Sequence, residues 1–244
     1  MIYKVLYLYK ELTFKHLKKI MKKYIVMLMV LCGGYATALA QAQPAATGSD
    51  NYTQVITQRA AKIVDVLNIT DSAKYKRVRN IIVNQYSSLN DIYNDRNTKR
   101  TQIKEQFAND KPTAVTRTAD VDSAVVKQVK ALHAQYLSKL TSELNADQVD
   151  KVKDGMTYRI YPITYTAYLD EIPSLTGEQK DKIKGWLLEA RENAIDAESS
   201  EKKHAWFGKF KGRINNYLSA QGYDMKKEGE EWQKRIKERA ATNK

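Results

Sequence analysis

The segment LTGEQKDKIKGWLLEARENAIDAESSEKKHAWFGKFKGRINNYLSAQGY, residues 175–223, predicts two helices joined by a short polar turn. Thr176 and Gln179 have the spacing of a capping box at the start of the first helix. Ser199 and Ser200 can cap the second helix, and Gly222 suits its left-handed C-terminal position. Apolar residues recur at helical spacing in both halves: Ile183, Leu187, Ala190 and Ala194, then Phe207, Phe210, Ile214, Tyr217 and Leu218. Because short turns favour antiparallel packing, the segment predicts a helical hairpin.

Residues 21–40, MKKYIVMLMVLCGGYATALA, have the three parts of a secretory signal peptide. Two lysines precede an apolar run over residues 24–32, and Ala38-Leu39-Ala40 has the small-residue pattern of a cleavage site. The apolar run is too short to span a membrane. We therefore expect cleavage after Ala40 and a periplasmic or secreted protein, whether translation starts at Met1 or at Met21.

The predicted division of the chain is an N-terminal extension with signal peptide over residues 1–40, a flexible leader over 41–50 and a helical domain over 51–244. Cys32 is the only cysteine. It could mark a lipoprotein, but the large Leu31 precedes it where a small residue is needed. Cleavage after Ala40 removes Cys32, so the mature chain has no disulfide and no thiolate metal site.

The net charge of the full chain is +13, and removing seven lysines and one glutamate with residues 1–40 lowers it to +7. A charge of this size, together with export, argues against nucleic acid as a partner. It favours an acidic oligosaccharide or another envelope protein. After signal cleavage we expect no transmembrane segment, and the residues do not determine the oligomeric state.

The pattern of the remaining chain predicts an all-α, single-domain helical bundle of about six or seven helices, with its core in residues 158–223. A first helix is expected over residues 51–67, with Tyr52, Val55, Ile56, Ile63 and Val64 on its inner side. Two long helices, about 75–107 and 120–143, flank a predicted loop over 109–116 that contains Pro112, and they form a long antiparallel helical hairpin. A charged last helix, 224–240, should be anchored by Met225, Trp232 and Ile236.

A tyrosine-rich piece lies between these elements. Tyr158, Tyr161, Tyr165 and Tyr168 are three, four and three residues apart, so they are expected to line one helix face. Pro162 must occupy a first turn or break the helix. With Arg159, these tyrosines form one half of a hypothetical ligand-binding site.

The second half of that site is His204, Trp206, Arg213 and Tyr217. Together with Phe210, the last three fall on one helix face, which is either part of the core or a binding face. As a binding face, the aromatic rings would stack on sugars and Arg213 would pair with a carboxylate. Gly208 and Gly212 are expected to serve close packing or close ligand approach.

No pattern in the sequence identifies catalytic chemistry. His133 and His204 have no partner at metal-ligand spacing, and we expect surface histidines and no metal. Glu189, Glu192 and Asp196 are expected on a solvated helix face. Asp170 and Glu171 are adjacent, so they point apart on a helix and cannot easily flank one glycosidic bond. There is no nucleophile elbow, phosphate loop or dinucleotide fingerprint, so we expect no cofactor and favour a protein that is not an enzyme.

Residues 154–179 and 186–235, including WFGKFKGRINNYLSAQGYD, resemble a family of exported bacterial proteins known only as a domain of unknown function. Members tend to be encoded near polysaccharide-degrading enzymes, pectin-related ones among them. The resemblance implies an exported helical fold and a role in glycan use. The family defines no catalytic residues, so it assigns none to this chain.

Two functional classes follow. The first is an exported binding or accessory protein for acidic polysaccharide. The alternative is a periplasmic chaperone-like or structural protein that binds other proteins. The helix start Leu175-Thr176-Gly177-Glu178-Gln179 resembles the LTxxQ pattern of small periplasmic stress chaperones, although a leucine before a capping residue suits any amphipathic helix. Similar starts occur at Leu67 and Leu144.

Overall fold

The computed structural model describes residues 48–242, and this part of the chain is all-α, with eight helices and no strand. The expected signal peptide, Cys32 and most of the leader lie outside the described residues. The helices are α2 (Gly48–Asp65), α3 (Ser72–Gln106), α4 (Lys111–Glu143), α5 (Ala146–Met156), α6 (Ile160–Glu171), α7 (Gly177–Ile195), α8 (Ser200–Ala220) and α9 (Met225–Thr242). The all-α prediction is confirmed, with one helix more than expected. Between residues 48 and 242, no helix has the length and apolarity needed to cross a membrane.

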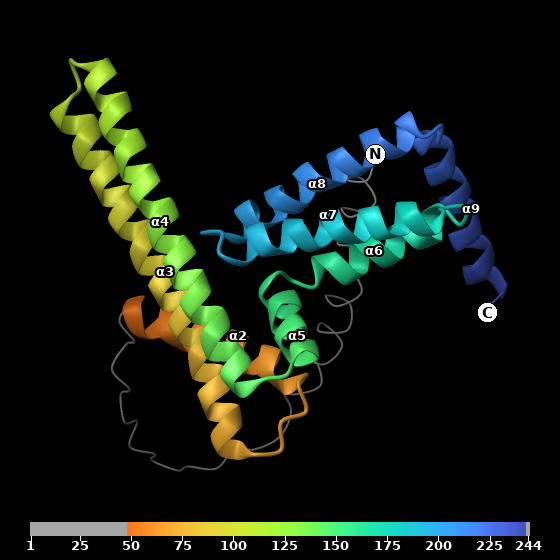
Figure 1. Ribbon diagram of the computed structural model, residues 1–244, viewed down its shortest axis with the longest axis horizontal. Helices are drawn as coiled ribbons and strands as arrows, with labels where there is room; N and C mark the ends of the chain where they lie inside the picture. The colour runs from red at the N-terminus through yellow and green to blue at the C-terminus, as the bar shows by residue number, and fades with distance from the viewer. Residues whose placement is uncertain (1–47, 243–244) are drawn as a thin grey trace, which may run out of the picture. The chain divides into compact units, whose positions relative to one another are not determined.

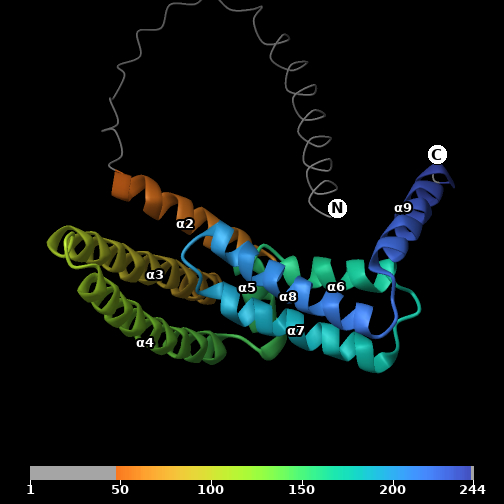
Figure 2. The same ribbon diagram turned by 90° about the horizontal axis from the view of Figure 1, so that it is seen from above.

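Helices α7 and α8 form the predicted antiparallel hairpin (Figures 1 and 2). The backbone N–H of Gln179 donates to Thr176 Oγ1 at 3.3 Å, and the Gln179 side chain accepts from the Thr176 N–H at 2.9 Å. Ser199 caps α8 by accepting from the Lys202 N–H at 3.1 Å. Gly222 has φ +93°, which only glycine adopts without cost. The hairpin prediction is therefore confirmed at both ends.

Helices α3 and α4 form the predicted long hairpin, which we call the arm (Figure 1). The loop expected over residues 109–116 is wrong, because α4 already begins at Lys111. Asp110 caps this helix by accepting from the Thr113 N–H, and Pro112 lies in its first turn. A first-turn proline loses no hydrogen bond, so it starts the helix here and does not break it.

The domain has two apolar clusters, and the expectation of a core within residues 158–223 describes only one of them. The first cluster is formed mainly by α2 to α5: Ala60, Ile63, Val64, Leu67, Val78, Ile82, Tyr136, Leu140, Leu144, Val149, Val152, Met156 and Ile195. The second is formed by α6 to α8: Tyr168, Ile172, Leu175, Ile183, Leu187, Ala190, Ala194, Phe207, Phe210, Ile214 and Leu218. The C-terminal end of α7 contributes to both clusters through Ala194 and Ile195.

The expected inner side of the first helix is only partly correct. Helix α2 begins at Gly48, three residues before the predicted start. Ile56, Ile63 and Val64 are buried, but Tyr52 and Val55 are exposed. The residues of α2 that join the first cluster all lie in its C-terminal half, so the N-terminal turns lack that apolar contact.

Helix α9 has no fully buried residue; Met225 at its start packs against the second cluster, as expected, and the rest of the helix is held by polar contacts. Trp232 Nε1 donates to Asp170 Oδ2 at 2.6 Å, and Arg239 Nη2 lies 2.8 Å from the same oxygen. Arg235 donates to the backbone carbonyls of Asp170 and Glu171. Ile236 is exposed, so its expected anchoring role is wrong, because polar contacts with the C-terminus of α6 hold this part of α9.

Candidate functional site

The turn between α5 and α6 has a strained backbone. Tyr158 has φ 58° and Arg159 has φ 56°, in the left-handed region that costs an L-residue about 1–2 kcal/mol. The Arg159 N–H donates to the Asp154 carbonyl at 2.7 Å, which closes the end of α5. Tyr158 therefore precedes α6, and the prediction that it shares a helix face with the later tyrosines is wrong.

The strained turn places Tyr158 on His204. Their rings stack in parallel, with centroids 5.5 Å apart and 6° between planes. Both side chains are exposed. The structure thus brings together two predicted site residues that α6 and α7 separate in the chain.

The other predicted tyrosines divide between surface and core. Tyr161 and Tyr165 stack on each other with centroids 6.2 Å apart, and the Arg191 guanidinium lies 5.4 Å from the Tyr161 ring. Tyr168 is buried in the second cluster, and its hydroxyl donates to Asn215 Oδ1 at 2.7 Å. Burial raises the pKa of Tyr168, so this side chain is a neutral part of the core.

Arg213 is exposed, Trp206 and Tyr217 are half-buried against the second cluster, and Phe210 of the same predicted face is buried. Trp186, Lys182 and Glu189 of α7 contact Arg213 and Tyr217, and Trp206 contacts Lys209 of its own helix. We call this group the aromatic–cationic surface; it comprises Lys182, Trp186 and Glu189 of α7 and Trp206, Lys209, Arg213 and Tyr217 of α8. The predicted face is therefore neither wholly core nor wholly surface.

Cations lie against the rings of the aromatic–cationic surface. The Arg213 guanidinium is 4.7 Å from the Trp186 ring centroid, and Lys182 Nζ is 4.7 Å from that of Tyr217. Trp186 and Tyr217 meet edge to face at 5.3 Å. Lys209 Nζ lies 5.2 Å from the Trp206 ring. Glu189 is 3.9 Å from Arg213, and both side chains are more than half exposed.

His204 does not belong to the aromatic–cationic surface. At 100° per residue, His204 lies on the flank of α8 that faces the α5–α6 turn, and Arg213 lies on the flank that faces α7. The nine predicted residues therefore form separate groups. A Cβ built on Gly208 or Gly212 meets no atom within 4 Å, so the expected role in close packing is wrong.

Sequence reasoning missed a buried polar group around Asp196, the C-terminal cap residue of α7. Its carboxylate accepts from Gln85 Nε2 at 2.9 Å and lies 2.6 Å from His133 Nδ1. Its backbone carbonyl accepts from the Tyr93 hydroxyl at 2.9 Å. We call these four residues the Asp196 centre. The expectation of a solvated Asp196 is wrong, because the arm folds over this end of α7 and places Gln85 and His133 on its carboxylate.

A row of ion pairs continues from the Asp196 centre along α5 and α7. Arg191 is 4% exposed and pairs with Asp150 at 2.6 Å and Asp154 at 2.7 Å. Lys153 Nζ lies 2.9 Å from Glu192, a residue that is only half-exposed and not fully solvated as expected. Burial raises the pKa of Asp154, and Arg191 opposes that effect. The row ties α5 to α7 beside the junction of the two apolar clusters.

Lys203 is a buried cation that links two helix ends. Its ammonium donates to the carbonyls of Met156 at 3.0 Å and Ile195 at 2.9 Å, the last residues of α5 and α7. The C-terminal end of a helix carries partial negative charge, so a cation is favourable there. Burial lowers the pKa of Lys203 to about 8. The residue was visible in the sequence as a lysine on the apolar stripe, four and seven residues before Phe207 and Phe210.

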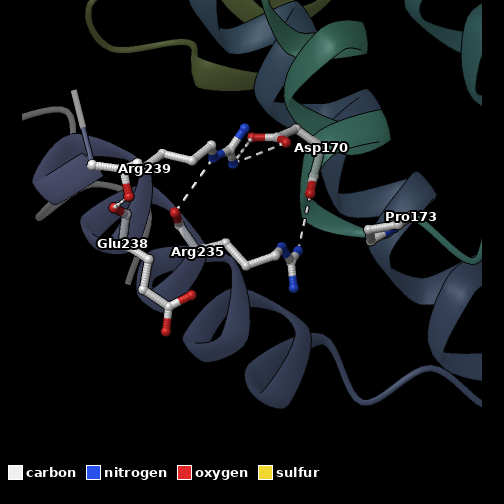
Figure 3. A pocket seen from close by; sticks show the side chains of 6 residues that line it. Asp170, Pro173, Arg235, Glu238 and Arg239 are labelled. Carbon is white, nitrogen blue, oxygen red and sulfur yellow. Dashed lines mark hydrogen bonds and ion pairs between the residues drawn. The ribbon is translucent and has the colours of Figure 1, made fainter.

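A hollow with a volume of about 510 Å³ lies between the end of α6 and α9 (Figure 3). It is lined by Asp170, Pro173, Arg235, Glu238, Arg239 and Thr242. As Figure 3 shows, Arg239 points to the Asp170 carboxylate and Arg235 to its backbone carbonyl. The hydrogen bonds from Arg239 and Trp232 lower the pKa of the Asp170 carboxyl. None of the nine predicted residues lines the hollow, so it is not the predicted ligand site. Within residues 48–242, no group of three or more histidine, cysteine or acidic residues could hold a metal ion.

Residues 53–238 match the model of a family described as proteins of unknown function, DUF3826. The chain belongs to this family. No curated protein matches its sequence. The DUF3826 match spans α2 to α9, so the aromatic–cationic surface, the Asp196 centre and the strained turn all lie within the family domain.

Proposed function

We propose that this DUF3826 member is an exported binding or accessory protein for acidic polysaccharide, and that it binds uronate-containing chains on the aromatic–cationic surface. One observation carries the proposal. Lys182, Lys209 and Arg213 all lie on one exposed side of the α7–α8 hairpin, each against an aromatic ring.

This arrangement suits an anionic sugar chemically. Guanidinium groups bind carboxylates with two parallel hydrogen bonds, and aromatic planes pack on the apolar faces of sugar rings. The rings also hold the long cationic side chains in place, which lowers the entropy lost when a ligand binds. Glu189 is the only carboxylate of the surface, and its exposed 3.9 Å contact leaves Arg213 free to exchange partners.

The N-terminal sequence supports the proposed setting. Residues 21–40 have the pattern of a signal peptide, and the mature chain would keep a net charge of +7. Cleavage after Ala40 would deliver a moderately basic domain to the periplasm or the medium, where acidic polysaccharides are found. N-terminal sequencing of protein from the native host tests this step, since an intact Met21 at steady state would contradict it.

Calorimetry with uronate oligosaccharides tests the binding site. Arg213→Ala should weaken binding by roughly 1.5–3 kcal/mol, the usual value of a hydrogen bond to a charged group, with little change in melting temperature. Trp206→Ala should weaken binding and cost modest stability. Lys184→Ala is the matched control, because Lys184 is an exposed cation two residues from Lys182 and so points to another side of α7. Equal affinity of Arg213→Ala and Lys184→Ala would refute the site.

A second candidate, binding of other proteins, is favoured by the arm. Val115 and Val126 of α4 are 69% and 67% exposed. They are eleven residues apart, about three full turns, and therefore lie on one side of α4. Cross-linking of partner proteins through the arm, lost in the double variant Val115→Ser and Val126→Ser, would favour this candidate over saccharide binding.

A further inference from the structure

The arm is attached to the α7–α8 turn mainly by polar side chains. The helices α3 and α4 pack along each other, and α3 also packs along α2, but neither packs its backbone closely on α7. Gln85 and Tyr93 of α3 and His133 of α4 all bond to Asp196. Arg96 of α3 lies 2.6 Å from Glu198 in the α7–α8 turn. The apolar contact of Ile195 with the first cluster, and Lys203 of α8 at 5.7 Å from the Tyr86 ring of α3, add to these bonds.

His133 is the member of this attachment that titrates near neutral pH. The Nδ1 atom of His133 lies 2.6 Å from the Asp196 carboxylate, and its Nε2 atom lies 3.9 Å from the carboxylate of Glu192 on α7. The ammonium of Lys153, on α5, lies 2.9 Å from the Glu192 carboxylate and partly neutralises its charge. From α3, the facing groups Gln85 and Tyr93 are neutral and bond Asp196. The Arg191 guanidinium also lies 3.7 Å from Glu192, so both of these cations lie on Glu192, whereas Asp196 bonds His133 directly and favours its charged form.

We propose that the Asp196 centre is a proton-responsive joint, in which protonation of His133 tightens the attachment of the arm to α7. Neutral His133 can donate one hydrogen bond, from Nδ1 to Asp196. Protonated His133 also carries a proton on Nε2, which adds an ion pair with Glu192. Glu192 lies on α7, Asp196 caps the C-terminus of α7, and the imidazole lies on α4, so the added charge interaction acts between the arm and the hairpin.

The direction of the effect follows from linkage. The hydrogen bond with Asp196, opposed by partial burial, raises the pKa of His133 above its value of 6.5 in an unfolded chain. A raised folded-state pKa gives stability that is fully present below pH 6.5 and is lost as the pH rises through the folded-state pKa. The arm is therefore held more tightly in mild acid than in mild alkali. This joint is independent of the proposed saccharide site, since it shares no residue with it.

Hydrogen exchange of the full chain at pH 5.5 and pH 8, corrected for intrinsic rates, tests the proposal. Peptides of α3 around Gln85–Arg96 and of α4 around His133 should be about two- to fivefold better protected at the lower pH, the range that one partly exposed charge pair supplies. Peptides of α8 and α9 provide the internal reference. A protection ratio that is the same in the arm and in this reference would overturn the proposal.

Two variants separate the proton from the hydrogen bond. His133→Asn keeps a side-chain donor near the Nδ1 position but cannot titrate, so its arm should show no pH response. Glu192→Gln keeps an acceptor for Lys153 while removing the charge that faces Nε2, and Glu192 is exposed enough for the fold to tolerate the change. It should reduce the pH response of the arm and lower the His133 pKa followed by NMR. A wild-type response in either variant would overturn the joint.

Discussion

Replacing Asp196 with alanine removes both side-chain bonds of the Asp196 centre and leaves the bond from Tyr93, which uses the backbone carbonyl. Gln85 is 2% exposed, so its amide loses its partner with little access to water, at a cost of about 1–3 kcal/mol. The lost charged bond to His133 adds about 1.5–3 kcal/mol, toward the lower end because that side chain is 24% exposed. We therefore expect Asp196→Ala to lower the free energy of unfolding by about 3–5 kcal/mol, the range found for broken buried ion pairs.

Urea denaturation followed by circular dichroism measures this loss, and calorimetry should show a melting temperature lower by about 6–20 °C. Glu189→Ala is the matched control, because Glu189 is an exposed carboxylate of the same helix. It should change stability by no more than about 0.5 kcal/mol. If Asp196→Ala and Glu189→Ala unfold at the same urea concentration, the Asp196 centre does not stabilise the domain and its role as an attachment point is wrong.

Three further substitutions test other features. As the pH rises from about 8 to 10, the wild type should gain stability relative to Lys203→Met. In this range the unfolded chain binds more protons at Lys203 than the folded chain, because burial lowers the folded-state pKa. Urea midpoints of the two proteins that shift equally with pH would contradict this. Tyr158→Gly should be more stable than Tyr158→Ala by about 1 kcal/mol, because both lose the ring but only glycine relieves the left-handed backbone. Gly155→Ala should destabilise by about 1–3 kcal/mol, because its Cβ would lie 2.9 Å from Cγ1 of buried Ile63; a thermal melt unchanged from wild type would exclude that clash.

The helices could be predicted because their information is local. Capping residues such as Thr176 and Ser199, and an apolar repeat of three and four residues, place the α7–α8 hairpin without any tertiary contact. The start of α4 was misplaced because Pro112 was interpreted as a loop residue, although a proline one residue after the first helical position is also a start signal. Local patterns therefore fix which residues are helical, and leave small errors at the boundaries.

The candidate site could be predicted only in part, because its contacts join distant segments. Charge alone suggested that Asp196 was solvated, and only the packing of the arm over α7 buries it beside His133. Trp186 was not selected, since its partnership with Arg213 depends on the register of two helices. His204 was selected, but its stacking on Tyr158 depends on the left-handed turn, which no repeat in the sequence indicates.

The arm extends well beyond its attachment, and this has a geometric consequence. Arg96 and its partner Glu198 mark the contact with the α7–α8 turn that lies furthest along α3, and the helix continues to Gln106. At 1.5 Å per residue, about 15 Å of helix α3 extends beyond the contact of Arg96 with Glu198. A rotation of the arm by about 10° about this contact would move the end of α3 by about 2.6 Å, enough to exchange one set of side-chain contacts for another. A small change in the angle of the arm at the Asp196 centre therefore becomes a larger displacement at the end of the arm.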